Sequence, residues 1–529
     1  MQSSGEQKRI NDVIYKIGFW FVLGCSLLLT GILCVSAFLT TAYSEDMTSQ
    51  LVLFRWDHFF VNVLGVVILV GLFGGIAVFV CKNPGKRKVW LLRAVMIWQA
   101  AAGIILVVFS KTVPAADAMS VYSIAEELAA GNLNVIHPVD SYLSYYPQQI
   151  GLAAFYEIII RIWNLLPVSL PAYHIIKCMN IVFGGVIIAA QYKTVGVLFS
   201  SDRADCFYLI LAGFNLPLIF YTSFVYGEIP SFALFSVGIW GILAFLRKER
   251  RYLLIVSLLA FSFSVLLRKN TLILIIAVLL VVLFEWIRRK QKLLPVFGLV
   301  CGIGAFGILP LTQAVYELRA GNSLSSGVPA ISYLAMGMQE SSRANGWYNG
   351  FNFNTYQESG MDYETTARVS REAINERLAV FQERPSYGLA FYRDKFLSQW
   401  ADGTYACRQA TLATFGGRSS FFQAVYEGRY SSYLIAFCNA WQNVLYLGTF
   451  LFCIIKIKGN EVSFYLKKKT DSVMTGLPVF VLLIGVIGGF LFHMIWEANS
   501  RYIFPYGLLL MPYCAYALDL IFPASRKSD

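Results

Sequence analysis

Five charged residues flank long apolar runs, where their side chains could do chemistry at a membrane surface. Asp117 comes a few residues after one apolar run, and Glu228 directly precedes another. A carboxylate in such a place can take a proton from a hydroxyl group. Arg268 and Lys269 interrupt two apolar runs, and Arg501 precedes the last one. Cations in these places can bind phosphate oxygens, and the planar guanidinium group of Arg suits this best.

Each of the five residues also has an ordinary structural explanation. The two carboxylates could cap helices, because acidic side chains favour helix N-termini. The basic pair at 268–269 could extend from a tight hairpin to the membrane surface. Arg501 lies four residues after Glu497, which is the spacing of an ion pair along a helix. Both kinds of explanation are compatible with the sequence.

A polar segment at 111–149 surrounds Asp117 and separates two apolar runs. Its apolar residues from 121 to 128 recur at helical spacing, and Gly131 offers a stop for that helix. The segment then returns to the apolar region through a Tyr-rich stretch closed by a proline. This stretch supplies three candidate substrate contacts, which are Tyr145, Tyr146 and Gln148.

A second polar segment, at 316–433, is far longer than an ordinary loop. Its many aromatic residues argue against disorder, and the alternating charges at 363–384 are typical of a surface helix. Lys395 and Trp400 are candidate substrate contacts in this segment, although packing of the loop explains them slightly better. Tyr502, at the start of the last apolar run, is a further candidate contact.

The composition indicates an all-α polytopic membrane protein. Of 529 residues, 57% are hydrophobic and only 14% are charged, whereas a soluble domain has about 25% charged residues. Apolar runs close to the ~20 residues needed to cross a bilayer recur along the whole chain. Because these runs are continuous rather than alternating, they predict helices and not a closed barrel. The candidate spans are 17–42, 59–81, 89–109, 150–166, 172–190, 207–224, 231–246, 253–267, 272–287, 294–315, 434–457, 477–495 and 502–521.

Basic residues between the spans predict their orientation. Lys and Arg cluster at 7–9, 82–88, 247–251, 288–292, 456–469 and 526–527. The positive-inside rule assigns these clusters to the cytoplasm, so the loops at 110–149 and 316–433 face the outside. Thirteen spans would leave the basic C-terminus outside. We therefore expect about 12 true spans, with one of the three segments between 150 and 224 re-entrant or interfacial.

These features divide the chain into five parts. They are N-terminal spans at 1–109, a first outer loop with an amphipathic helix at 110–149, a central transmembrane bundle at 150–315, a large extracytoplasmic loop at 316–433, and C-terminal spans with a cytoplasmic tail at 434–529.

Several other kinds of function lack support in the sequence. The net charge of +12 does not indicate a nucleic-acid partner, because the basic residues lie in short loops between spans. Gly302, Gly304 and Gly307 match a dinucleotide-binding pattern, but they lie inside a span, where small residues favour close helix packing. Walker A, HExxH and DxD motifs are missing, and the four His residues lack metal-ligand spacing. We therefore expect neither a cofactor nor a metal.

The order and common sidedness of the charged motifs resemble the GT-C superfamily of polytopic glycosyltransferases. The similarity is greatest to family 39-like bacterial members, the relatives of protein mannosyltransferases and aminoarabinose transferases. The matching pieces are Asp117 with its helix, 145–149 (YYPQQ), 226–230 (YGEIP), 267–270 (LRKN) and 500–505 (SRYIFP).

This resemblance implies a bundle of about 12 membrane helices with two large extracytoplasmic loops. It also implies transfer of a hexose or pentose from a polyprenyl-phosphate donor to a cell-surface glycan, lipid or protein at a bacterial plasma membrane. Asp117 would activate the acceptor, and Glu228 would be a second acid lining the site. Arg501, and less directly Arg268 and Lys269, would hold the donor phosphate. Members often carry two acidic residues together where this chain has only Asp117, so the second acid must come from elsewhere.

Two rival functions are a transporter or flippase for a lipid-linked glycan, and a glycan polymerase or ligase. A transporter favours inverted repeats and ionisable residues near the middle of spans, and the sequence has neither pattern. A polymerase or ligase, whose acceptor is itself lipid-linked, fits the long outer loop equally well.

Overall fold

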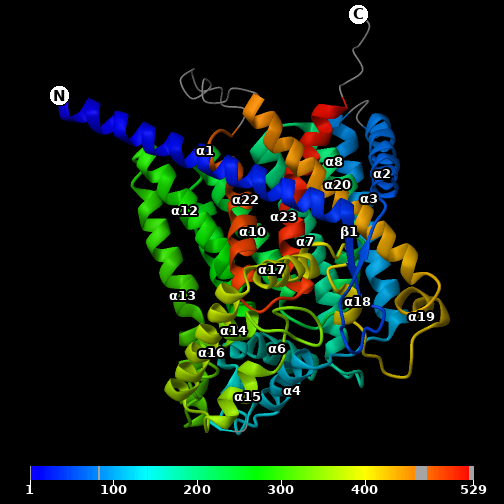
Figure 1. The fold of residues 1–529 in the computed structure, drawn as a ribbon, viewed down its shortest axis with the longest axis vertical. Coiled ribbons are helices and arrows are strands. Elements are labelled where there is room, and N and C mark those ends of the chain that lie inside the picture. The colour runs from blue at the N-terminus through cyan, green and yellow to red at the C-terminus, as the bar shows by residue number, and fades with distance from the viewer. Residues whose placement is uncertain (1, 81–83, 140, 459–473, 523–529) are drawn as a thin grey trace, which may run out of the picture.

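The computed structural model describes residues 2–80, 84–139, 141–458 and 474–522. Over these ranges the chain is an all-α polytopic membrane protein with one short β-hairpin. Ten of the described helices are long and apolar enough to cross a bilayer. Figure 1 shows long helices running through the upper part of the molecule, with shorter helices gathered at its lower end.

The ten candidate spans come from all parts of the described chain. They are α1 (Gln2–Leu39), α2 (Phe59–Val80), α3 (Pro84–Ser110), α7 (Tyr173–Phe199), α10 (Glu228–Lys248), α12 (Thr271–Arg289), α13 (Leu293–Ala320), α20 (Ser431–Lys458), α22 (Val481–Ile495) with the turn η2 (Leu477–Phe480), and α23 (Phe504–Ile521) with the turn η3 (Ser500–Ile503). A further apolar helix, α11 (Tyr252–Leu267), has only 16 residues.

Helix α10 is the most enclosed of these spans. Two glycines on it let α11 approach closely, because a Cβ on Gly238 would lie 2.5 Å from the ring of Phe261. A Cβ on Gly241 would lie 2.4 Å from Oγ of Ser257. Small residues at a helix contact are typical of packing inside membranes.

Two of the spans expected from the sequence do not form single long helices. The segment predicted at 150–166 contains α6 (Ile150–Trp163), which has 14 residues. The segment predicted at 207–224 is divided between α8 (Asp202–Gly213) and α9 (Leu216–Tyr221). The break has a local cause, since the side chain of Asn215 accepts a hydrogen bond from the Leu218 amide at 3.1 Å and Pro217 follows it. The ten long helices are therefore fewer than the expected 12.

Helix α6 packs on α4 (Asp117–Ala129) at the lower end of the molecule (Figure 1). Arg161 on α6 donates a hydrogen bond to the carbonyl of Leu128 at 2.8 Å. The buried carboxylate of Glu157 pairs with Arg161 and, from α13, with Arg319 at 3.2 Å. These contacts attach the polar segment at 111–149 to the membrane helices.

The polar segment predicted at 316–433 is folded over most of its length. It contains α14 (Ala330–Gly337), α15 (Phe351–Glu358), α16 (Tyr363–Glu383), α17 (Pro385–Trp400), α18 (Cys407–Ala410) and α19 (Ser420–Tyr426). The expected helix at 363–384 is α16, and the side chain of Asp362 caps its start.

An antiparallel hairpin of β1 (Thr40–Tyr43) and β2 (Leu53–Trp56) lies between α1 and α2. It is hydrogen-bonded to the large polar segment at two points. The Ala42 amide donates to the Ala401 carbonyl at 2.9 Å, and the Val52 amide donates to the Arg343 carbonyl at 2.9 Å. The hairpin therefore attaches the large segment to the first two spans.

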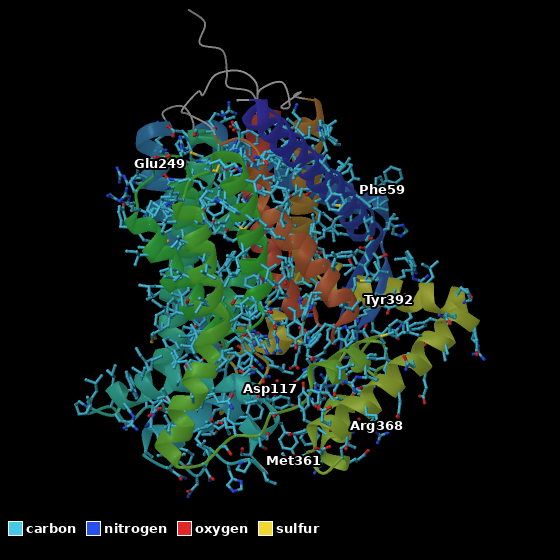
Figure 2. The ribbon with its side chains drawn as sticks, turned by 90° about the vertical axis from the view of Figure 1, so that its left-hand side faces the viewer. Phe59, Asp117, Glu249, Met361, Arg368 and Tyr392 are labelled. Carbon is cyan, nitrogen blue, oxygen red and sulfur yellow. The ribbon has the colours of Figure 1, made fainter. Side chains whose placement is uncertain are left out.

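The two ends of the described chain lie at the same end of the molecule. In Figure 1, α1 starts and α23 ends at the top, opposite to the short helices. Glu249, within the basic segment at 247–251, also lies towards the top, whereas Asp117 lies near the bottom (Figure 2). Of the basic segments that predict orientation, 82–83, 459–469 and 526–527 fall outside the described residues.

Candidate functional site

Three charged side chains from distant parts of the sequence meet at the ends of membrane helices. Glu228 opens α10, Arg268 follows α11, and Arg501 lies in η3. Nη2 of Arg268 is 2.9 Å from Oε1 of Glu228, and Nε of Arg501 is 3.5 Å from the same oxygen. Glu228 is only 5% exposed. We call these three residues the arginine cluster.

Aromatic rings surround the two guanidinium groups of the arginine cluster. The guanidinium carbon of Arg268 is 4.8 Å from the ring centre of Tyr226 and 5.8 Å from that of Tyr502. That of Arg501 is 5.3 Å from the Tyr502 ring. Cations over aromatic faces are attracted electrostatically. Gln149, at the end of the polar segment 111–149, donates a hydrogen bond to the Tyr226 hydroxyl at 2.6 Å, so this segment also contacts the aromatic rings around the arginine cluster.

These contacts decide between two alternatives that the sequence leaves open. Among the described ion pairs, Arg501 pairs with Glu228, and the pair with Glu497 that helical spacing suggests does not appear. Gly227 occupies the N-cap position of α10, which has no side-chain cap hydrogen bond. Glu228 is therefore an ion-pair partner of two arginines and not a helix cap.

The short contact between Glu228 and Arg268 requires a glycine before Glu228. A Cβ on Gly227 would lie 2.4 Å from the backbone oxygen of Leu267 and 3.6 Å from Cδ of Arg268. The backbone oxygen cannot move away without shifting the end of α11.

We expect Gly227→Ala to lower the melting temperature of the purified protein, because the added methyl group pushes the end of α11 away from α10. Forcing a methyl group into such a contact costs ~1–3 kcal/mol. Gly184→Ala is the matched control, because a Cβ there meets nothing within 4 Å and alanine is favoured in a helix. Equal melting temperatures for the two variants would contradict the close approach of α10 and α11.

Asp117 lies exposed at the first position of α4, after a strained residue. Ala116 has φ 49° and ψ −133°, a region that L-residues rarely adopt. The side chain of Asp117 does not cap the helix, since Ala116 is the N-cap residue and no side-chain cap hydrogen bond is present. Helix α4 otherwise follows the expected pattern, with buried residues from 121 to 128 and Gly131 at φ 87°.

Several tyrosines lie close enough to Asp117 for its negative charge to raise their pKa values, among them Tyr142, Tyr146 and Tyr348. Burial raises the pKa of Tyr142, Tyr146 and Tyr348, and the negative charge of Asp117 raises these pKa values further. Their hydroxyl groups stay neutral at physiological pH and can donate hydrogen bonds. Asp117 is therefore an exposed carboxylate with neutral hydroxyl donors in its surroundings, a combination that can bind a polyhydroxylated molecule.

Glu497 lies on the same side of the site, in the loop between α22 and η3. Its carboxylate accepts a hydrogen bond from the Tyr502 hydroxyl at 3.2 Å. The loop is held in place from outside, because Nζ of Lys395 donates to the Trp496 carbonyl at 2.8 Å and the Ala498 amide donates to the Gly346 carbonyl at 2.8 Å. Burial raises the pKa of Glu497 to about 7. The charge of Asp117 adds to this rise, while Arg501 and Tyr502 oppose it.

A cavity of about 30 Å³ lies beside the arginine cluster, which is room for a water molecule. Arg268, Arg501 and His493 provide polar groups on its wall. Phe232 and Leu274, from the membrane helices α10 and α12, make another part of the wall apolar. The cavity therefore borders both the charged cluster and the membrane interior.

Some residues expected at the site lie away from the arginine cluster. Lys269 is exposed, and its side chain makes no ion pair among the described residues. Tyr145 is buried and stacks on Phe353 at 4.7 Å. Gln148 is half-buried, and its neighbour Gln149 is the residue that contacts Tyr226.

Lys395 and Trp400 pack the large loop, which is the explanation slightly favoured from the sequence. Nζ of Lys395 donates to the carbonyls of Gly337 and Trp496. Trp400 is 1% exposed, with its ring 6.0 Å from that of Tyr506 on α23. Both side chains therefore hold the loop against the last two spans.

Burial makes the contribution of Lys395 to stability depend on pH. Its pKa falls from the ordinary 10.5 to about 7, so the unfolded chain binds more protons between these values. The free energy of unfolding of the wild type should therefore rise with pH over this window. Lys395→Met lacks this rise, so we expect its melting temperature to fall relative to the wild type from pH 7 to pH 10. A constant difference across that range would contradict a depressed lysine pKa.

Three residues of the site were not singled out for a functional role by sequence reasoning. They are Gln149, His493 and Glu497. Glu497 could have been found from the sequence, because it follows the predicted span 477–495 and lies on the same predicted side as Asp117. Nothing in the sequence separates Gln149 from Gln148, because the turn geometry decides which side chain faces Tyr226.

Within the described residues, no three His, Cys, Asp or Glu side chains are grouped as a metal site requires. A comparison with protein-family models finds no match, and a comparison with curated proteins finds no significant similarity.

Proposed function

We propose that this protein is a membrane glycosyltransferase of the GT-C type. It would move a sugar from a polyprenyl-phosphate donor to an acceptor outside the cytoplasm. One observation carries this proposal, namely that Arg268 and Arg501 converge beside a cavity while the exposed carboxylate of Asp117 lies at the same end of the molecule. The site thus combines phosphate-binding groups with a base.

The donor phosphate would bind to the guanidinium groups of Arg268 and Arg501, which form strong hydrogen bonds to phosphate oxygens. Lys269 is exposed and lies outside the arginine cluster, so it would contribute less to phosphate binding. The prenyl chain would lie along the apolar wall formed by Phe232 and Leu274. In this arrangement the sugar would lie towards the polar segments at 110–149 and 316–433.

Asp117 would take the proton of the acceptor hydroxyl as its oxygen attacks C1 of the sugar. The bond between C1 and the phosphate oxygen breaks, and the arginines stabilise the charge on the leaving phosphate. Direct displacement of this kind inverts the configuration at C1. Tyr146 and Tyr502 would contact the sugar or acceptor through their rings and hydroxyl groups.

We further propose twelve membrane crossings. Helices α8 and α9 follow α3 from one end towards the other, as shown by a Lys88–Asp205 contact at 3.0 Å and a Gln99–Ala212 hydrogen bond at 2.8 Å. This broken pair and the short helix α11 would add two crossings to the ten long helices. An even number agrees with α1 starting and α23 ending at the same end (Figure 1).

The site would face the extracytoplasmic side of a bacterial plasma membrane. The basic segment at 247–251 lies at the end of the molecule opposite to Asp117 (Figure 2), and the positive-inside rule assigns that segment to the cytoplasm. An acceptor at this location would be a cell-surface glycan, lipid or protein.

A transfer assay tests the proposal. The purified protein would receive radiolabelled polyprenyl-phosphate sugars, with a membrane extract as the source of acceptor. We expect label to appear in a new product only when the protein is present. If no donor supports transfer, and labelled lipid instead crosses proteoliposome membranes, the protein is a flippase and the proposal is wrong.

A further inference from the structure

The arginine cluster does not supply enough positive charge for the reaction proposed above, on which this inference rests. Its two guanidinium groups and one carboxylate carry a net charge of +1. A polyprenyl-phosphate sugar is a phosphodiester with one negative charge, and the net charge of the cluster balances that charge. The leaving phosphate monoester has a second pKa of about 6 and approaches two negative charges at neutral pH. Since uncompensated charge in a buried site is costly, a proton delivered to the leaving group would restore the balance.

Glu497 is placed to deliver that proton. Its carboxylate is hydrogen-bonded to the Tyr502 hydroxyl at 3.2 Å, and the Tyr502 ring lies 5.3 Å from Arg501 and 5.8 Å from Arg268. One side chain thus separates the Glu497 carboxyl from the groups that would hold the phosphate. The backbone contacts on either side of Glu497 fix its position before any substrate binds.

We infer that Glu497 is the general acid of this site, paired with Asp117 as the general base. The acceptor proton passes to Asp117, the acceptor oxygen bonds to C1, and the bond between C1 and the phosphate oxygen breaks. The electron pair stays on that oxygen, which takes the proton of Glu497. Glu228 is then a positioning residue that holds the two arginines, and not the second acid.

The environments of the two carboxyl groups fit this division of roles. Asp117 is exposed at a helix N-terminus, where its negative charge is favoured. Glu497 is partly buried, and its raised pKa of about 7 keeps a large fraction protonated at neutral pH. An exposed carboxylate together with a partly buried carboxyl group is an arrangement that serves acid–base chemistry at a glycosidic centre. The charged or titratable groups around Glu497 are Asp117, Tyr146, Tyr333, Arg343, Tyr348, Lys395, His493, Arg501 and Tyr502.

The experiment is the pH profile of kcat/KM for sugar transfer. The wild-type rate should fall as pH rises above about 7, as the acid loses its proton. Glu497→Gln should be slower by ~10²-fold. It should also lack the decrease in rate above pH 7, which we call the basic limb of the profile. Glu497→Asp keeps an acid and should retain the limb. Tyr502→Phe removes a hydrogen bond that stabilises the carboxylate, so it should shift the limb to higher pH.

A modified donor separates proton donation from a structural role. Fluorine atoms on the lipid next to the phosphate make that phosphate a better leaving group, which needs less assistance. This donor should recover much of the rate of Glu497→Gln, and much less of the rate of Asp117→Asn. With the wild type it should weaken the basic limb, so the test holds even if a variant fails to fold. Glu364→Gln, at an exposed position of α16, is the control for a carboxylate change elsewhere.

The outcomes separate this inference from the proposed function. If the wild type transfers no sugar from any polyprenyl phosphate, the proposed function is wrong and the inference falls with it. If the wild type is active and Glu497→Gln keeps its basic limb, only the assignment of Glu497 is wrong. If His493→Gln loses the basic limb while Glu497→Gln keeps it, the general acid is His493 and not Glu497.

Discussion

Replacing Asp117 with Asn should lower the rate of sugar transfer by ~10²-fold or more, while the protein still folds. A positioned general base contributes ~10²–10⁴-fold to the rate, and an amide cannot accept the acceptor proton. The side chain of Asp117 is exposed and caps nothing, so its loss removes only its favourable interaction with the helix dipole, ~0.3–1 kcal/mol. The measurement is kcat/KM for transfer, beside the melting temperature in detergent.

Glu127→Gln is the matched control for the Asp117 variant. Glu127 is an exposed carboxylate on the same helix, and its described contact is with Asn132 at 2.7 Å. We expect its transfer rate to stay close to that of the wild type. Transfer at the wild-type rate by Asp117→Asn would remove Asp117 as the base and leave it as the first residue of α4.

Replacing Arg501 with Gln should lower both stability and donor binding. The variant leaves the buried carboxylate of Glu228 with one cation instead of two. Removing one partner of a buried ion pair costs ~3–5 kcal/mol, and the cost here is smaller because Arg268 remains. Adding Glu228→Gln to this variant removes the carboxylate that needs the partner, so part of the lost melting temperature should return. Transfer should not return, because the phosphate-binding guanidinium is still missing.

Arg368→Gln provides the comparison for an exposed ion pair. Arg368 lies on α16 at the surface (Figure 2), and its pair with Glu372 has side chains 62% and 58% exposed. Such pairs contribute ~0.5 kcal/mol or less, so this variant should melt and react like the wild type. If Arg501→Gln behaved as Arg368→Gln does, or if the double variant were no more stable than Arg501→Gln, the arginine cluster would not be a coupled unit.

Much of the fold follows from hydrophobicity along the chain. Continuous apolar runs must form helices in lipid, because each backbone polar group needs a partner within its own segment. The exceptions are 150–166 and 207–224, which are apolar but form short or broken helices. These segments contain single polar residues, such as the helix-capping Asn215 and the buried, ion-paired Glu157, that go with short or broken helices. A hydrophobicity average over ~20 residues does not register such single residues.

The sequence by itself determined that this is a helical membrane protein with a folded polar segment at 316–433. It also singled out Asp117, Glu228, Arg268 and Arg501 by their charge at the ends of apolar runs. Chemistry at a membrane boundary requires such residues, and lipid disfavours them elsewhere, so their positions carry a signal without any contact being known.

Only the tertiary structure decided which of these residues lie together. The partner of Arg501 is Glu228, distant in the chain, and not Glu497 four residues away. That choice depends on the close approach of α10 and α11 at Gly227, and no spacing rule encodes it. The tertiary structure also placed Glu497 in a partly buried loop facing Asp117, where burial and neighbouring charges set its pKa. Such shifts arise from groups brought together by folding, so they are properties of the folded chain and not of its residue types.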